Sequence, residues 1–551
     1  MSPLRFCIHA SAPEPARARC GTLSISKADQ HGSTDQNGSS SKRVIETPGC
    51  FMYSIKGSVP HLTPDNMRLQ DFGGIHVSLE QILQTDQPGS FTKWPSTPAS
   101  PKFTLADYLH LQDLILLCDL RDYSSPSPSS SSTPDSSTSR IGPNTDRHVL
   151  LSTPKGVRQL TLDDYLKVVR QFQPDIVSAL ADNITDAKEP AQKRVHKSID
   201  RTLRWLDQIL VERQGGDGRI EDRRVEEEKR VKKEKKERRK AMAKEQQRLE
   251  DNKQEPESRV EVSPIATEAW TDVAVFANVQ GSQFEEERIW SAEETAKREG
   301  VDGFIVNTAE LTGWCGKDEI WKLVQTSIER LPAQKPRLVS GIQAPEDILK
   351  AVALGVDLFD TSYPYQLTED GKASLYYFGE SGAATAPTTG SSNNSRWINL
   401  WDDEHGDKFV PILEGCECYA CKGSKHSRAY INHLLKTHEM LATVLLMSHN
   451  MYQYGKFFAA VREAVKAGTL DQSSKTFHEK FGVEPIRTGE KHPAQIVVEA
   501  ALSKRNQRLD GAEPAVVEAI GLGEKGMKKR PEGDEKAEKE IKKVKKAQGS
   551  A

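Results

Sequence analysis

Short apolar runs alternate with amphipathic segments along the middle of this 551-residue chain, and this alternation limits the folds that the chain can adopt. Helical patterns such as LTLDDYLKVVRQF (160–172) and APEDILKAVALG (344–355) lie among the apolar runs. Strands that alternate with helices form parallel sheets through right-handed crossovers. The sequence therefore predicts an α/β fold, either a doubly wound sheet or an eight-stranded (β/α)8 barrel. The predicted strands are DIVSALAD (175–182), DVAVFANVQG (272–281), GFIVNT (303–308), PRLVSGI (336–342) and GVDLFDTSYP (355–364).

Several common functions are disfavoured by what the sequence lacks. No GxGxxG or GxxxxGK[ST] motif follows any predicted strand, which argues against dinucleotide and nucleoside-triphosphate binding. The 76 basic and 79 acidic residues give a net charge of −3, so the overall charge neither predicts nor excludes nucleic-acid binding. No apolar run approaches the roughly 18 residues that cross a bilayer, and the N-terminus lacks a signal-peptide pattern. We therefore expect an intracellular protein without membrane insertion.

Three polar segments are expected to interrupt or extend the ordered core. They are a serine-rich loop at 124–139, a charged insertion at 213–260 and a charged tail at 506–551. Acidic residues are interleaved through the insertion, which favours a solvated helical or disordered segment over a nucleic-acid contact. The remaining chain then divides into the N-terminal strands with the first part of the core, the remainder of the core, and a C-terminal subdomain with closing helices. These parts are 1–212, 261–410 and 411–505.

Three of the eight cysteines, Cys416, Cys418 and Cys421, fall within six positions. This C-x-C-x-x-C spacing lets three thiolates meet at one ion, and zinc requires a fourth ligand to complete its tetrahedron. Periodicity alone does not choose that ligand, because both His438 and His449 fall on an apolar helical stripe. The other cysteines are scattered, which is typical of reduced thiols rather than of a disulfide framework. The candidates for the fourth ligand are His426, His433, His438 and His449.

The stretch CECYACKGSKHSRAYINHLLKTHEMLATVLLMSHNMYQY (416–454) resembles the zinc motif of tRNA-guanine transglycosylases. ARARCGTLSIS (16–26) and ETPGCFMYSIKGSVPHLTPDNM (46–67) are similar to the N-terminal segments of that family, and GIQAPEDILKAVALGVDLFDTSYP (341–364) is similar to its nucleophile segment. The resemblance implies a TIM barrel with a small zinc subdomain. It also implies one structural Zn²⁺, with His449 as the fourth ligand beside the three cysteines.

The family's catalytic pattern is only partly present. The resemblance maps its aspartate nucleophile to Asp360, at a strand end where (β/α)8 barrels place catalytic groups. We find no counterpart of the DSGGFQ segment that supplies the second aspartate. The purine-binding aspartate aligns with Ala181, or with Asp182 after a shift; Gln280 is kept, and Gln366 replaces an arginine. We therefore expect no catalytic residue, with Asp360 as a relic.

This pattern resembles the non-catalytic branch of the family in eukaryotes. The resemblance implies a heterodimer with a catalytic queuine tRNA-ribosyltransferase subunit, which exchanges guanine for queuine at the wobble position of tRNAs with GUN anticodons. It also implies a cytoplasmic protein that associates peripherally with the mitochondrial outer membrane. Two alternatives stay open: an active transglycosylase with Asp360 as nucleophile, and a zinc-dependent RNA-binding module without an enzyme partner.

Overall fold

The computed structural model describes residues 2–11, 17–25, 43–83, 104–122, 144–153, 156–184, 189–216, 269–308, 311, 315–379, 395–482 and 492–499. The chain forms two compact units, Met1–Glu490 and Lys491–Ala551. In the second unit, residues 493–499 are helical. The serine-rich loop at 124–139, the charged insertion from residue 217 onward and the tail at 506–551 lie outside the described residues.

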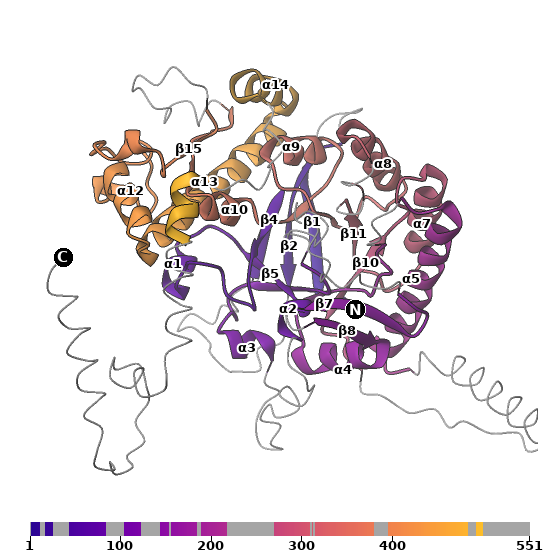
Figure 1. Ribbon diagram of the computed structural model, residues 1–551. Helices are drawn as coiled ribbons and strands as arrows, with labels where there is room; N and C mark the ends of the chain where they lie inside the picture. The colour runs from indigo at the N-terminus through magenta and orange to yellow at the C-terminus, as the bar shows by residue number, and fades with distance from the viewer. Residues whose placement is uncertain are drawn as a thin grey trace, which may run out of the picture. The chain divides into compact units, whose positions relative to one another are not determined.

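The first unit contains a closed barrel of eight parallel strands (Figure 1). Each strand pairs with the next in chain order, and β13 returns to β4, with Asp360 opposite Phe51. This closure decides between the two predicted folds, and the predicted barrel is confirmed. All five predicted strands are present, and each is shorter than its predicted range. In chain order the strands are β4 (Gly49–Tyr53), β5 (Gly74–Ser78), β6 (Ile115–Asp119), β9 (Ile176–Ser178), β10 (Ala274–Val279), β11 (Gly303–Asn307), β12 (Arg337–Ser340) and β13 (Leu358–Thr361).

Helices surround the barrel, as predicted for the segments between the strands (Figure 1). The helix expected near 160–172 is α4, and the Thr161 side chain caps it by accepting a hydrogen bond from the Asp164 amide at 3.2 Å. The helix expected near 344–355 is α9, which has Pro345 at its start and acidic residues in its first turn. The helices around the barrel are α4 (Leu162–Phe172), α5 (Gln192–Arg213), α7 (Glu285–Ala296), α8 (Lys317–Glu329), α9 (Pro345–Ala353) and α10 (Tyr363–Glu369).

An antiparallel sheet of β1 (Leu4–Ser11), β2 (Arg19–Ile25) and β3 (Arg43–Thr47) closes the end of the barrel where the strands begin. Arg19 donates to both carboxylate oxygens of Asp357, just before β13, at 2.7 and 2.6 Å. Apolar side chains of the sheet pack with inward-facing residues of the barrel strands, so this half of the interior is an ordinary core. The cluster comprises Leu23, Ile25, Ile45, Phe51, Ile115, Leu117, Ile176, Ala274, Phe276, Ile305, Leu338 and Leu358.

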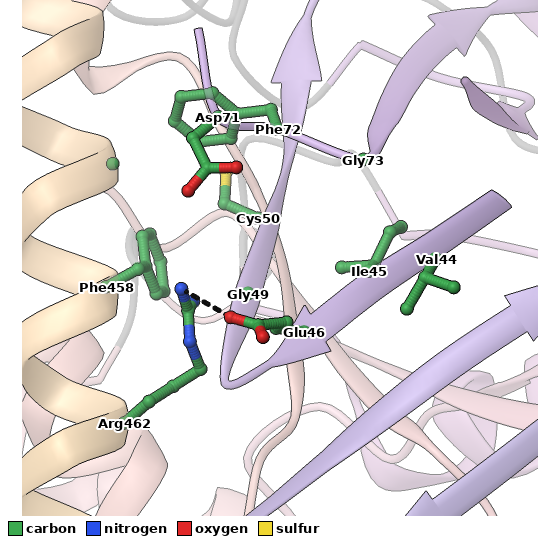
Figure 2. Close-up of a pocket in the computed structure, with 11 residues that line it drawn as sticks. Val44, Ile45, Glu46, Gly49, Cys50, Asp71, Phe72, Gly73, Phe458 and Arg462 are labelled. Atoms are coloured by element: carbon green, nitrogen blue, oxygen red, sulfur yellow. Dashed lines mark ion pairs between the residues drawn. The ribbon is translucent and has the colours of Figure 1, made fainter. Parts of the chain in front are cut away.

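The long helix α13 (Met440–Ala467) joins the closed end of the barrel to the C-terminal subdomain. Figure 2 shows Arg462 reaching from this helix to the carboxylate of Glu46, at 3.0 Å. The same guanidinium donates to the Pro48 carbonyl at 3.1 Å. Phe458 and Arg462 line a small pocket of about 80 Å³ together with residues of β3 and β4. These contacts fix α13 against the barrel and so position the residues nearer its start.

None of the helices in the described part of the chain has the length and apolarity needed to span a membrane.

The remaining elements are short or belong to the C-terminal subdomain. The elements are α1 (Pro64–Arg68), α2 (Leu79–Ile82), α3 (Leu105–Leu109), β7 (His148–Thr153), β8 (Gly156–Thr161), β14 (Lys372–Ser374), β15 (Trp397–Asn399), η3 (Asp403–His405), η4 (Lys422–Ser424), α12 (Arg428–Lys436) and α14 (Leu470–Phe481).

Candidate metal centre and barrel mouth

Cys416, Cys418 and Cys421 surround the imidazole of His449, which lies on α13. The Nδ1 atom of His449 is 3.7, 3.5 and 3.5 Å from the three Sγ atoms in that order. A tetrahedral zinc ion with Zn–S bonds of about 2.3 Å and a Zn–N bond of about 2.0 Å sets S···N edges of about 3.5 Å. The four buried side chains could hold a metal ion, and their spacing fits zinc.

A hydrogen bond at the far side of the ring determines the tautomer of His449. Its Nε2 atom lies 2.8 Å from the backbone carbonyl of Ser374, in β14. Because a carbonyl only accepts, Nε2 carries the proton and Nδ1 presents its lone pair to the thiols. Asn450, the next residue, accepts from the Ser374 amide at 2.9 Å and donates to the Lys372 carbonyl at 2.9 Å, which fixes that strand.

The cysteine loop is held by the start of α12. Ser427 caps this helix by accepting from the Tyr430 amide at 3.2 Å, and Arg428 donates to the carbonyls of Pro411 and Ile412 at 3.2 and 2.8 Å. Gln453 donates to the Sγ atom of Cys416 at 3.2 Å. A thiolate acceptor suits this hydrogen bond, so the surroundings as well as the four ligands favour a metal-bound state.

The three cysteine thiols lie close enough to shift one another's pKa. Hydrogen bonds from Cys418 and Cys421 lower the pKa of Cys416, whereas the same coupling to Cys416 raises the pKa of Cys418. A divalent cation would bind all three cysteines as thiolates, since its charge offsets their mutual repulsion.

The other candidate histidines lie away from this centre. His426 stacks on the ring of Tyr430, with 5.8 Å between ring centroids. His433 and His438 are exposed, and His438 has a left-handed backbone with φ of 58°. Of the four candidates, His449 is therefore the one that the structure brings to the cysteines. None of the eight cysteines, all of which lie in the described residues, forms a disulfide.

The open end of the barrel carries a second group of polar residues. Side chains alternate along a strand, so the next inward position lies two residues beyond the apolar layer. In all eight strands that position is a buried residue with a polar side chain, at the end where TIM barrels place their chemistry. These residues are Tyr53, His76, Asp119, Ser178, Asn278, Asn307, Ser340 and Asp360.

Three of these side chains lie together. His76, Asp119 and Asp360 each offer one ligand atom, and these atoms lie within 4.8 Å of one another. Desolvation by burial raises the pKa of Asp360 well above its ordinary value and also raises the pKa of Asp119. Burial lowers the pKa of His76. The predicted relic Asp360 therefore faces a second aspartate across the barrel mouth.

Asp182, the shifted candidate for purine binding, is fully buried and engaged by other side chains. Arg194 donates to its two carboxylate oxygens at 2.9 and 3.1 Å, and Asn144 donates to one of them at 2.8 Å. Arg201 forms a further ion pair with it. Both arginines come from α5. Ala181, the other aligned position, offers no polar side chain and is also buried.

Gln280 is also satisfied within the protein. Its Nε2 atom donates to Asn183 at 2.8 Å, and its Oε1 atom accepts from the Thr202 hydroxyl at 2.8 Å. Gln366 donates to the Ser362 hydroxyl at 2.8 Å in the first turn of α10. Both glutamine side chains thus take part in hydrogen bonds within the chain.

Comparison with protein families then identifies the chain. A family model described as queuine tRNA-ribosyltransferase matches residues 15–221 and 225–482. The chain belongs to the queuine tRNA-ribosyltransferase family. A relative from Danio rerio, named queuine tRNA-ribosyltransferase accessory subunit 2, is 30% identical over 471 residues, covering 81% of this chain and 95% of the relative. The Homo sapiens protein of the same name is 29% identical over 469 residues, with 80% and 94% covered.

The structure adds one observation to the sequence comparison with this queuine tRNA-ribosyltransferase family. The segment that supplies a second aspartate has no counterpart in the sequence, but Asp119 ends β6 and lies beside Asp360. The residues after it, Leu120 and Arg121, do not match the family motif, and a serine-rich stretch follows soon after. A single aspartate at a strand end carries too little pattern to be recognised without the barrel.

Proposed function

We propose that this chain is the non-catalytic subunit of a heterodimeric queuine tRNA-ribosyltransferase. With a catalytic homologue, it supports the exchange of guanine for queuine at the wobble position of tRNAs with GUN anticodons. The names of the relatives support an accessory role. We place the complex in the cytoplasm, and its association with the mitochondrial outer membrane rests on the family resemblance alone.

The observation that carries the proposal is the set of contacts around Asp182. A carboxylate that reads a purine edge must have an oxygen free to accept from the base. Here both oxygens accept from Arg194, and Arg201 and Asn144 add further contacts. Releasing a buried carboxylate from such partners costs several kcal/mol, on the order of 3–5. Because all these partners of Asp182 come from the chain itself, the contacts support the proposal that this carboxylate does not bind a purine base.

The pair of Asp119 and Asp360 is the feature that favours the alternative, an active enzyme. Base exchange at a ribose carbon needs an ionised nucleophile and a second acid or base. Burial raises the pKa of both aspartates, so the nucleophile would have to lose its proton in a desolvated site. The experiment below decides between the accessory role and the active enzyme.

We further propose that Cys416, Cys418, Cys421 and His449 hold one structural Zn²⁺. Four protein ligands complete a tetrahedron, whereas a catalytic zinc site keeps one position open for water. When bound, the ion would supply no chemistry to the reaction. It would tie the loop before α12 to α13, and through α13 to the barrel.

The subdomain around this centre carries several exposed apolar side chains, and we propose that they contact a protein partner. Phe409 and Met440 are each 83% exposed. The rings of Tyr419, His426 and Tyr430 follow one another, at centroid distances of 6.2 and 5.8 Å. We define the apolar surface by its exposed members, which are Phe409, Val410, Tyr419, Tyr430, Met440 and Leu441.

The decisive experiment measures exchange of labelled guanine in tRNA. Four samples are compared: this chain alone, the catalytic homologue alone, the mixture, and the mixture with Asp360→Ala in this chain. Activity only in the mixture, unchanged by the substitution, supports the proposal. Activity of this chain alone that Asp360→Ala abolishes would identify Asp360 as a nucleophile.

The control is the loss of exchange when the nucleophile of the catalytic homologue is substituted instead. Co-purification tests the second alternative. A zinc-dependent RNA-binding module without an enzyme partner would bind tRNA but would not retain the catalytic homologue.

A further inference from the structure

The cluster of His76, Asp119 and Asp360 at the barrel mouth has no part in the proposed accessory role, yet it combines ionisable groups that rarely share a buried site. The exposed fractions of the three residues are 4, 3 and 6%. They come from β5, β6 and β13, three strands that are brought together only by closure of the barrel. Their ligand atoms all lie within 4.8 Å of one another.

His76 supplies an observation independent of the carboxylates. Its Nε2 atom is buried and has no hydrogen-bond partner among the described residues. A buried polar atom without a partner destabilises a protein by about 1–3 kcal/mol, and it is therefore uncommon in native structures. One imidazole and two carboxylates can together ligate a metal ion, and the imidazole here has a buried nitrogen without a partner among the described residues.

We propose that His76, Asp119 and Asp360 together bind one divalent metal ion at the mouth of the barrel. This site is separate from the cysteine centre and independent of whether the chain is an accessory subunit.

The charges and ligand types agree with such an ion. Two carboxylates within 4.8 Å oppose each other's ionisation in a desolvated site, and a divalent cation balances both. Carboxylate oxygens with an imidazole nitrogen suit ions such as Mn²⁺, Fe²⁺ or Zn²⁺, whereas thiolates select softer ions.

The two centres would differ in coordination. The cysteine centre has four protein ligands, so its tetrahedron is complete. The barrel site has three, which leaves positions for water or for an oxygen of a bound molecule. The site also lies at the barrel end where ligands reach a (β/α)8 fold.

The test is a Mn²⁺ titration of the full chain with its cysteine centre already loaded with Zn²⁺. Binding is followed by loss of the electron paramagnetic resonance signal of free Mn²⁺. We expect one Mn²⁺ per chain, and affinity at least tenfold weaker in each of Asp119→Asn, Asp360→Asn and His76→Gln. Each variant preserves approximate side-chain size; the Asp→Asn changes remove a negative charge, and His76→Gln replaces the imidazole nitrogen by a weaker amide donor. The control is Asp113→Asn, which removes an exposed carboxylate paired with Arg68.

A second measurement guards against variants that fail to fold. Mn²⁺ should raise the unfolding temperature of the unsubstituted chain, because it binds only the folded form, and should raise that of the variants less. Zinc content and circular dichroism establish that each variant is folded. The proposal is overturned if the unsubstituted chain binds no Mn²⁺ at millimolar concentration, or if all three variants bind it as tightly as the control.

Discussion

His449 and Ser374 are joined by a hydrogen bond of 2.8 Å between the imidazole Nε2 and the backbone carbonyl. The bond links the long helix α13 to the short strand β14, and it orients Nδ1 toward three buried cysteines. Metal affinity should therefore depend on residues that do not contact the ion, because they position the Ser374 carbonyl that orients the imidazole of His449.

Asn450→Ala is the substitution that tests this dependence. Asn450 binds the Ser374 amide and hydroxyl at 2.9 and 3.1 Å and the Thr368 hydroxyl at 3.1 Å. Its loss frees β14, so we expect zinc affinity to fall about 10- to 100-fold. Competition with a chromophoric chelator measures this. Unchanged affinity would mean that β14 does not position His449.

Cys418→Ser should lower zinc content and stability together. Removing one of four ligands leaves an incomplete tetrahedron, and metal binding and folding are coupled. We expect loss of stoichiometric zinc, a lower unfolding temperature and weaker pairing with the catalytic homologue. Elemental analysis, thermal unfolding and co-purification measure these in turn.

The matched control for this variant is Cys315→Ser, which changes a partly exposed cysteine outside the centre. It should keep zinc and pairing. A zinc-free Cys418→Ser chain that still formed a stable, active heterodimer would refute a structural role for the metal.

The barrel was predictable because its strands are buried on both sides. Runs such as GFIVNT and PRLVSGI have apolar centres, and each is followed or preceded by an amphipathic helix. Closure was not predictable, since a doubly wound sheet gives the same alternation. It depends on the pairing of β13 with β4, across roughly 300 residues of chain.

The candidate site was only partly predictable for a similar reason. The cysteine knuckle is local and has its own spacing, whereas the choice of His449 required a family resemblance. Asp119 was not among the predicted site residues, although the apolar run ILLCD ends on this aspartate just as DLFD ends on Asp360. Arg194 and Arg201, which form ion pairs with Asp182, lie on a helix whose sequence pattern does not indicate which carboxylate its arginines bind.

Asp182→Asn separates a structural carboxylate from a substrate-binding one. The substitution keeps the shape but removes the charge that neutralises Arg194 and Arg201, so the chain should be destabilised by about 3–5 kcal/mol. The KM of the heterodimer for guanine should not change. Urea unfolding and steady-state exchange measure the two effects. A large rise in KM with normal stability would instead place Asp182 in a base-binding pocket.

The apolar surface gives the last prediction, which concerns pairing alone. Phe409 and Met440 are each 83% exposed, so Phe409→Asp and Met440→Asp should leave folding and zinc content unchanged. If these side chains are buried against the catalytic homologue, each substitution places a charge in a desolvated interface. We expect a loss of about 1–4 kcal/mol, or roughly fivefold to a thousandfold in Kd. The control is Leu69→Asp, at a residue 64% exposed on the barrel unit but outside the apolar surface. Analytical ultracentrifugation of the mixture measures the three Kd values. If all three substitutions had equal effects, the interface would not lie on the apolar surface of the zinc subdomain.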